Sequence, residues 1–89
     1  MFDWDDGNLD HIAEHDVSAA EAEEALLDPE RIPATAYRAR GERRRAVLGA
    51  TTGGRLLYLV FIRRGPLFRV ITARDASTRD RRRYRLRRG

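Results

Sequence analysis

Arginine supplies every permanently cationic side chain that this sequence could use for chemistry. All eighteen residues of the Lys and Arg classes are arginine, and there is no cysteine. A guanidinium stays protonated in proteins, grips phosphate through two parallel hydrogen bonds and stacks on aromatic rings. The composition therefore suits anion binding and stabilisation of negative charge better than proton transfer, and it excludes thiolate and disulfide chemistry.

Two histidines are the main candidates for moving a proton. His11 and His15 are four residues apart, so on a continuous helix they share one face and could both ligate a metal. Such a site needs a third or fourth ligand, and only scattered carboxylates such as Asp10 and Glu14 are near. His15 could instead end a helix, where its positive form favours the dipole. Because imidazole titrates near neutrality, His15 is also a candidate general base.

Two arginines lie on one expected strand, Leu67 to Ala73, and at its exit. Arg69 and Arg74 are five residues apart, so an unbroken strand would aim them at opposite faces. Only a bulge would bring both to one groove. Arg74 stands beside Asp75, which could simply pair with it. A charge at Arg69, within an apolar stretch, requires an open face or a partner.

Three further groups of arginines come from separate parts of the chain, at 43–45, 63–64 and 81–83. If they converge, they form a phosphate-binding surface whose affinity falls steeply with salt; the alternative is a solvated face. Tyr84 could stack on an RNA base or could dock its helix. The RNA-binding residues predicted from these groups are Arg44, Arg45, Arg63, Arg64, Arg82 and Arg83.

Charge is divided sharply along the chain. Residues 1–30 hold eleven of the fourteen acidic residues and no arginine, whereas residues 31–89 hold eighteen arginines and three acids, for charges of −11 and +15. Part of this split would follow if acidic helices packed near basic strands. The density of arginine near the C-terminus points instead to an anionic partner.

The strand pattern centres on Leu56 to Ile62, an unbroken apolar run typical of a strand covered on both faces. Arg63 to Pro66 and Thr52 to Gly54 are expected turns on either side of it. Pro33 allows only an edge strand near it. The other expected strands are Phe2 to Trp4 (very short), Ala34 to Arg38 (edge), Arg43 to Thr51 and Leu67 to Ala73.

Three helices are expected from their N-terminal caps. Asp5 or Asp6 can cap a helix over Gly7 to His15. Ser18 with Glu21 forms a capping box that opens Ala19 to Leu27, and Ser77 with Asp80 repeats this spacing before Thr78 to Leu86. The last helix has few apolar residues, so we expect it to be frayed or held by a partner.

These elements predict one α+β domain over residues 1–89. The two N-terminal helices pack on one face of a small antiparallel β-meander of three to five strands, a basic helix follows, and the other sheet face is left for function. The acidic start, MFDWDD, is unlike a signal peptide, and seven apolar residues fall short of the roughly 20 of a membrane span. We expect a soluble cytoplasmic protein with no membrane contact. No phosphate-cradling glycine motif, HExxH or nucleophile elbow is present, and we expect neither metal nor cofactor.

Three segments carry a resemblance: FDWDDGNLDHIAEHDVSAAEAEEALLDP, GRLLYLVFIRRGPLFRVITARDAS and RDRRRYR. They resemble the BrnT-like toxins of type II toxin–antitoxin pairs, in the RelE/ParE-like group. The most specific parts are Trp4-Asp5, the helix junction around His15 and Ser18, and the strand exit from Ile71 to Ser77. The resemblance implies a RelE-like fold and an endoribonuclease that inhibits translation by cleaving mRNA, including mRNA on the ribosome, and that a cognate antitoxin neutralises. Oligomers are expected only through the antitoxin.

The resemblance also implies a metal-independent mechanism with the RNA 2′-hydroxyl as nucleophile. His15 matches the junction histidine of the family, Arg74 the strand-exit arginine and Tyr84 the aromatic residue of the final helix. In this interpretation the guanidinium groups stabilise the pentacoordinate phosphate, His15 (failing it Glu42 or Asp75) takes the proton, and Tyr84 orients the base. The predicted catalytic residues are therefore His15, Arg69, Arg74, Arg81 and Tyr84.

Two residues depart from the family pattern. Glu14 stands where the family commonly has lysine, and Asp16 where it has glycine. Because Glu14 would repel phosphate, the N-terminal helix is not expected to join the RNA site. One alternative is a non-catalytic, degenerate toxin that binds RNA, ribosome or protein through its arginine surface. Another is an interaction protein whose arginine-rich helix grips an acidic antitoxin.

Overall fold

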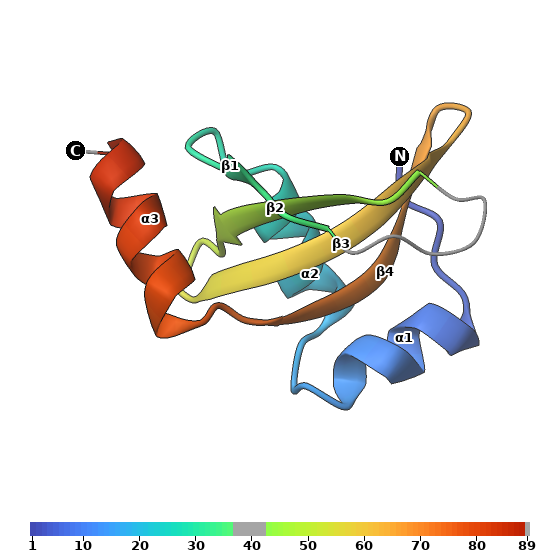
Figure 1. Ribbon diagram of the computed structural model, residues 1–89. Helices are drawn as coiled ribbons and strands as arrows, with labels where there is room; N and C mark the ends of the chain where they lie inside the picture. The colour runs from blue at the N-terminus through green and yellow to red at the C-terminus, as the bar shows by residue number, and fades with distance from the viewer. Residues whose placement is uncertain (37–42, 89) are drawn as a thin grey trace.

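The structure is a computed structural model that describes residues 1–36 and 43–88. Its strands form one antiparallel sheet in the order β1-β2-β3-β4, so each strand lies beside the next one along the chain (Figure 1). The predicted α+β fold, with a meander between N-terminal helices and a basic C-terminal helix, is confirmed. The elements are α1 (Asp6–Ala13), α2 (Ala19–Leu26), β1 (Ile32–Ala34), β2 (Arg45–Ala50), β3 (Leu56–Arg64), β4 (Leu67–Asp75) and α3 (Thr78–Arg88).

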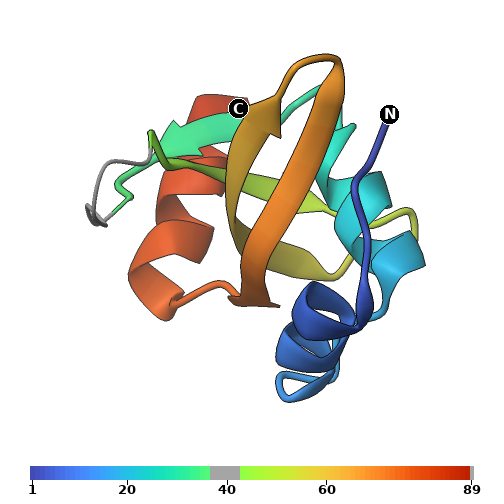
Figure 2. The ribbon, with the colours of Figure 1, turned by 90° about the vertical axis from the view of Figure 1, so that its right-hand side faces the viewer.

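The central strand β3 is buried on both faces, as its apolar run predicts. Leu57 and Leu59 pack with residues of α1 and α2, whereas Tyr58 and Val60 belong to a second core that includes Tyr84 of α3. Figure 2 shows α3 on one side of the sheet and α1 and α2 on the other. The second face is therefore partly covered, at one end, by the basic helix.

The two N-terminal helices begin at the predicted caps. Asp5 is the N-cap of α1, where its carboxylate accepts the Asn8 N–H at 3.2 Å and the Asn8 side chain accepts the Asp5 N–H at 2.8 Å. Ser18 and Glu21 form the predicted capping box of α2. The first helix ends at Ala13 instead of His15, because the chain turns through Asp16, which has the left-handed φ of 56°. The structure thus shows a positive φ at Asp16, the position at which the resemblance implies glycine.

Helix α2 lies directly against β2 because position 49 has no side chain. A Cβ on Gly49 would stand only 2.0 Å from the carbonyl oxygen of Ala25. Glycine therefore permits the close approach of the helix backbone to the strand.

Several strand boundaries differ from the prediction. The edge strand covers Ile32–Ala34, with Pro33 opposite Val47, and not Ala34 to Arg38; positions 37 and 38 lie outside the described residues. Because Pro33 lies in an edge strand, its lack of an N–H group costs the sheet no hydrogen bond. The β3–β4 hairpin is longer than predicted, because Gly65, with φ of 56°, allows a turn of only two residues. The expected N-terminal strand is a single parallel bridge from Phe2 to Phe68.

Strand β4 contains a bulge that decides where its arginines point. Phe61 pairs with Val70 but Val60 pairs with Thr72, so β4 carries one extra residue. As a result Arg69 lies opposite Ile62 and Arg74 opposite Tyr58, two positions on the same face of β3. The bulge in β4 therefore brings Arg69 and Arg74 to one face of the sheet, which an unbroken strand would not do.

No helix within residues 1–36 and 43–88 combines the length and apolar character that crossing a membrane requires.

Candidate functional site

A cavity of about 390 Å³ opens between α3, the end of β1 and the exit of β4. We call it the α3 cavity. Among its described lining residues are three arginines and a single carboxylate, that of Asp80. The arginines can bind an anion, and the carboxylate of Asp80 can accept a proton. The lining residues are Ala34, Thr35, Tyr58, Arg74, Ser77, Arg79, Asp80 and Arg83.

Arg74 is held by an aromatic ring and not by a carboxylate. Its Cζ lies 4.5 Å from the ring centroid of Tyr58, and the Tyr58 hydroxyl donates to the Thr35 carbonyl at 2.8 Å. The neighbouring carboxylate of Asp75 instead accepts a hydrogen bond from Arg55 Nε at 2.8 Å. The alternative in which Asp75 pairs with Arg74 is therefore not realised. Arg74 has no acidic partner within the described part of the chain.

The first turns of α3 supply the other charged groups. Ser77 accepts the Asp80 N–H at 3.1 Å, which caps the helix. Arg83 lies 3.5 Å from the Asp80 carboxylate and donates to the Pro33 carbonyl at 3.2 Å. The side chain of Arg79 is exposed and forms no hydrogen bond or ion pair with any described residue. The positive end of the helix dipole adds to their attraction for an anion.

Tyr84 anchors α3 to the body of the protein. Its side chain is 4% exposed, and its hydroxyl donates to Asp28 Oδ2 at 2.5 Å. Asp28 also accepts the backbone N–H groups of Ala50 and Glu30. Of the two roles predicted for Tyr84, the structure shows the docking of its helix, and its buried ring does not suit stacking on a base. The helix extends to Arg88 and is not frayed over this length, whereas a partner that holds it stays a prediction.

Arg69 and Arg81 lie outside the α3 cavity. Arg69 shares a sheet face with Arg74, but it forms ion pairs with Asp5 at 3.0 Å and Asp3 at 3.6 Å. The hydrogen bond from Arg69 is the largest cause of the lowered pKa of Asp5 and, in turn, raises the pKa of Arg69. Arg81 donates from Nε to the Ala76 carbonyl at 3.3 Å. Both are engaged in contacts within the chain.

His15 is exposed and does not line the α3 cavity. Its ring meets that of His11 edge to face, with 6.0 Å between centroids. Within residues 1–36 and 43–88, no three His, Cys, Asp or Glu residues are grouped closely enough to hold a metal. The predicted role of His15 as general base stays a prediction. Glu42, a substitute base, lies outside the described residues.

Arg55 connects the α1–α2 junction to the exit of β4. Besides Asp75 it contacts Glu21 at 3.2 Å and donates to the backbone carbonyls of His15 and Asp16 at 3.2 and 2.6 Å. The hydrogen bond from Arg55 is the main cause of the lowered pKa of Asp75. The pKa of Glu21 is lowered first by the Ser18 N–H and then by Arg55. The contacts of Arg55 thus hold Asp75, the residue next to Arg74, in place.

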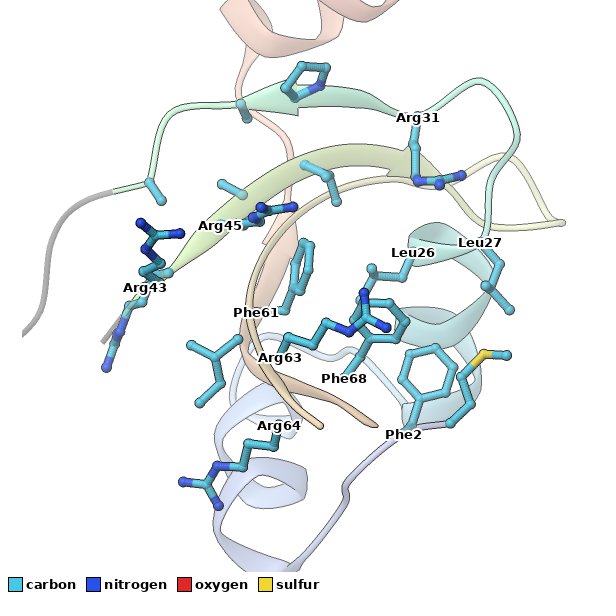
Figure 3. Close-up of a pocket in the computed structure, with 18 residues that line it drawn as sticks. Phe2, Leu26, Leu27, Arg31, Arg43, Arg45, Phe61, Arg63, Arg64 and Phe68 are labelled. Atoms are coloured by element: carbon cyan, nitrogen blue, oxygen red, sulfur yellow. The ribbon is translucent and has the colours of Figure 1, made fainter. Parts of the chain in front are cut away.

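Two of the three predicted arginine groups meet in a different place. A groove of about 1170 Å³ at the far end of β3 is lined by Arg43, Arg44, Arg45, Arg63 and Arg64, together with Arg31 (Figure 3). Of the third group, Arg83 lines the α3 cavity and Arg82 is exposed on α3 and lines neither hollow. The basic residues therefore form two sites, where the sequence suggested one surface.

Six of the eight described residues that line the α3 cavity were not predicted as functional, among them Tyr58, Ser77, Arg79 and Asp80. The spacing of Ser77 and Asp80 does reveal the start of α3, and that start faces the exit of β4. Tyr58 gives no sequence signal apart from its place in an apolar strand. Its role depends on the cross-strand register with Arg74.

Comparison with known proteins supplies the family. A search of curated proteins found no match. The family model described as the ribonuclease toxin BrnT of type II toxin–antitoxin systems matches residues 4–80, which run from Trp4, just before the cap of α1, to Asp80 in the first turn of α3. The matched region thus includes Arg74, Arg79 and Asp80. This chain therefore belongs to the BrnT family of ribonuclease toxins of type II toxin–antitoxin systems.

Proposed function

We propose that this protein cleaves mRNA at the α3 cavity by a metal-independent mechanism, inhibits translation in this way, and is neutralised by its antitoxin. Membership in the family implies an RNA substrate and a protein antitoxin. The observation that carries the proposal is the arrangement of Arg74, which has no acidic partner among the described residues, beside Arg79, Arg83 and the carboxylate of Asp80.

The three guanidinium groups would hold the scissile phosphate. Arg74 is oriented by the Tyr58 ring, and Arg83 by the Pro33 carbonyl and Asp80. Groups fixed before the reaction stabilise the charge that grows on the phosphate without further reorganisation. A cavity of about 390 Å³ is also within the usual range for a small-molecule or nucleotide site.

Asp80 would act as the general base. It removes the 2′-hydroxyl proton as that oxygen attacks the neighbouring phosphorus, the bond to the 5′-oxygen breaks, and this oxygen takes a proton from solvent. The products are a 2′,3′-cyclic phosphate and a 5′-hydroxyl. Asp80 is preferred to Asp75 because the hydrogen bond from Arg55 lowers the pKa of Asp75 and makes it a weaker base.

RNA cleavage in EDTA tests the reaction. The purified protein is incubated with an mRNA fragment and with the same fragment carrying 2′-deoxynucleotides at the mapped cut sites. We expect fragments that end in 2′,3′-cyclic phosphate from the first RNA only. Salt-sensitive binding of intact RNA would instead support the non-catalytic module, and neither binding nor cleavage would contradict both.

Expression in cells tests the effect on translation and the neutralisation. Incorporation of labelled amino acids should fall when the protein is produced and recover when its cognate antitoxin is expressed with it. The Arg74→Ala variant should leave incorporation unchanged. A fall of equal size with Arg74→Ala would show that translation is inhibited without the α3 cavity.

A further inference from the structure

The large groove at the far end of β3 has an unusual composition. Each of its eighteen described lining residues is either apolar or arginine (Figure 3). These residues thus provide neither a carboxylate nor an uncharged hydrogen-bonding side chain. Its apolar side chains include Phe2, Leu26, Leu27, Val47, Phe61 and Phe68. We call it the arginine-rimmed groove.

We propose that the arginine-rimmed groove binds an acidic amphipathic segment of the antitoxin. The inference rests on the proposed function only for the identity of the partner. In such a segment apolar side chains alternate with carboxylates. Its apolar side chains would be buried against the apolar residues of the groove, and its carboxylates would pair with the arginines of the groove. Such complementarity of charge also steers association and fixes the register of the bound segment.

Four of the six described arginines that line the groove, Arg43, Arg45, Arg63 and Arg64, are available for such pairing. Arg43 and Arg45 are exposed and form no ion pair with a described residue. Arg63 is exposed and lies with its Cζ 5.3 Å from the ring centroid of Phe68. Arg64 has an acidic neighbour, Asp3, only at 3.9 Å. Carboxylates from a partner would therefore meet these four guanidinium groups, which have no acidic partner closer than 3.9 Å among the described residues.

The apolar part of the groove favours a protein segment over RNA. Leu27 is 53% exposed, so a partner could still remove apolar surface from water there. The ring of Phe61 is 8% exposed and packs edge to face on Phe68 at 5.7 Å between centroids. Phe61 belongs to the core, and the partly buried ring of Phe68 packs against it and lies beneath the Arg63 guanidinium, so neither ring is an open platform for a base. A phosphate backbone would leave the apolar side chains without a partner.

Size and position fit a second site on the protein. The groove holds about 1170 Å³, above the range of roughly 300–1,000 Å³ usual for small ligands, so several side chains of one segment could enter it. It shares only Ala34 with the α3 cavity among the described residues that line each. Substitutions in the two sites can therefore be separated.

The affinity of the purified cognate antitoxin tests the inference. The variants are Arg31→Glu/Arg43→Glu and, separately, Leu27→Asp. The matched control is Arg82→Glu/Arg85→Glu, which makes the same charge change on exposed positions of α3 that line neither site. We expect each groove variant to weaken antitoxin binding by about tenfold or more, with RNA cleavage unchanged, and the control to bind the antitoxin nearly as wild type does.

Three results would overturn the inference. Unchanged antitoxin affinity in both groove variants would do so, as would loss of RNA binding with antitoxin binding intact, which would assign the groove to RNA. An antitoxin that binds the wild type more weakly than about 1 μM would also count against it. If the wild type leaves RNA intact while the groove variants lose antitoxin binding, the proposed ribonuclease function fails and this inference stands.

Discussion

Arg74 and Tyr58 face each other across the β3–β4 ladder, and the guanidinium lies over the ring at 4.5 Å. The register of the sheet therefore places the Arg74 guanidinium at the α3 cavity. Because Asp75 is bound by Arg55, the charge of Arg74 is not cancelled by its neighbour. Arg74 is thus positioned by Tyr58, and a different residue, Arg55, binds the Asp75 carboxylate that could otherwise pair with Arg74.

Replacing Tyr58 tests the positioning of Arg74. Tyr58→Leu removes the ring beneath the guanidinium and should slow single-turnover RNA cleavage by about tenfold, as expected for loss of a cation–π contact of about 1–2 kcal/mol. Tyr58→Phe keeps the ring and loses the hydrogen bond to Thr35, so its rate should stay near wild type. Equal rates in the two variants would show that the ring does not orient Arg74.

Replacing Asp80 tests the general base. Asp80→Asn retains the shape of the side chain but cannot take a proton, so cleavage should fall by about 100-fold or more. Asp80→Glu should recover part of the activity, and the RNA affinity of Asp80→Asn should not fall, because the charge it removes is negative. His15→Gln should cleave within about threefold of wild type. Cleavage lost in His15→Gln and kept in Asp80→Asn would transfer the role to His15.

Tyr84→Phe tests the anchor of α3. The substitution removes the hydroxyl that donates to the buried Asp28 carboxylate and leaves the ring in place. Since a buried acceptor that loses a donor is costly, the free energy of unfolding in urea should fall by about 1–3 kcal/mol. Arg85→Ala, an exposed position on the same helix, is the control and should change stability little. Equal stability of Tyr84→Phe and wild type would contradict the anchor.

Arg55→Gln tests the network behind the β4 exit through its pH dependence. Bonds to Arg55 and Ser18 hold the pKa values of Asp75 and Glu21 below their ordinary range, so these groups stabilise the fold above about pH 4–5 and lose that effect as the pH falls through the lowered values. The melting temperatures of wild type and variant should therefore differ most near neutral pH and converge as the pH falls below the ordinary values of 3.8 for Asp75 and 4.5 for Glu21. Part of the Glu21 contribution remains in the variant because Ser18 still donates to it. A gap that does not change with pH would exclude the network.

Elements governed by local rules could be predicted from the sequence. The apolar run from Leu56 reveals a strand buried on both faces, and Ser18 with Glu21 marks the start of α2, because both signals depend only on nearby residues. The bulge in β4 could not be predicted. It arises from the pairing of Val60 and Phe61 with a second strand, and it reverses the expected relation of Arg69 to Arg74.

Partners distant in sequence account for most of what the sequence did not reveal about the site. The preference of Asp75 for Arg55 over adjacent Arg74 joins residues 20 apart, and the Tyr84–Asp28 bond joins residues 56 apart. Arg69 is a conspicuous mid-strand cation, yet its charge is met by Asp3 and Asp5 from the other end of the chain. Arg74 was predicted from its place at the strand exit and from the resemblance, whereas its neighbours in the α3 cavity could be found only from the fold.

The single-turnover cleavage rate of Arg74→Ala, measured in EDTA beside Arg85→Ala, tests the central claim most directly. Both substitutions remove one arginine, but only Arg74 lines the α3 cavity. We predict a rate about 100–1,000-fold below wild type for Arg74→Ala, as for loss of one fixed group that stabilises the transition state, and a rate near wild type for Arg85→Ala. Equal rates in the two variants would contradict catalysis at this cavity.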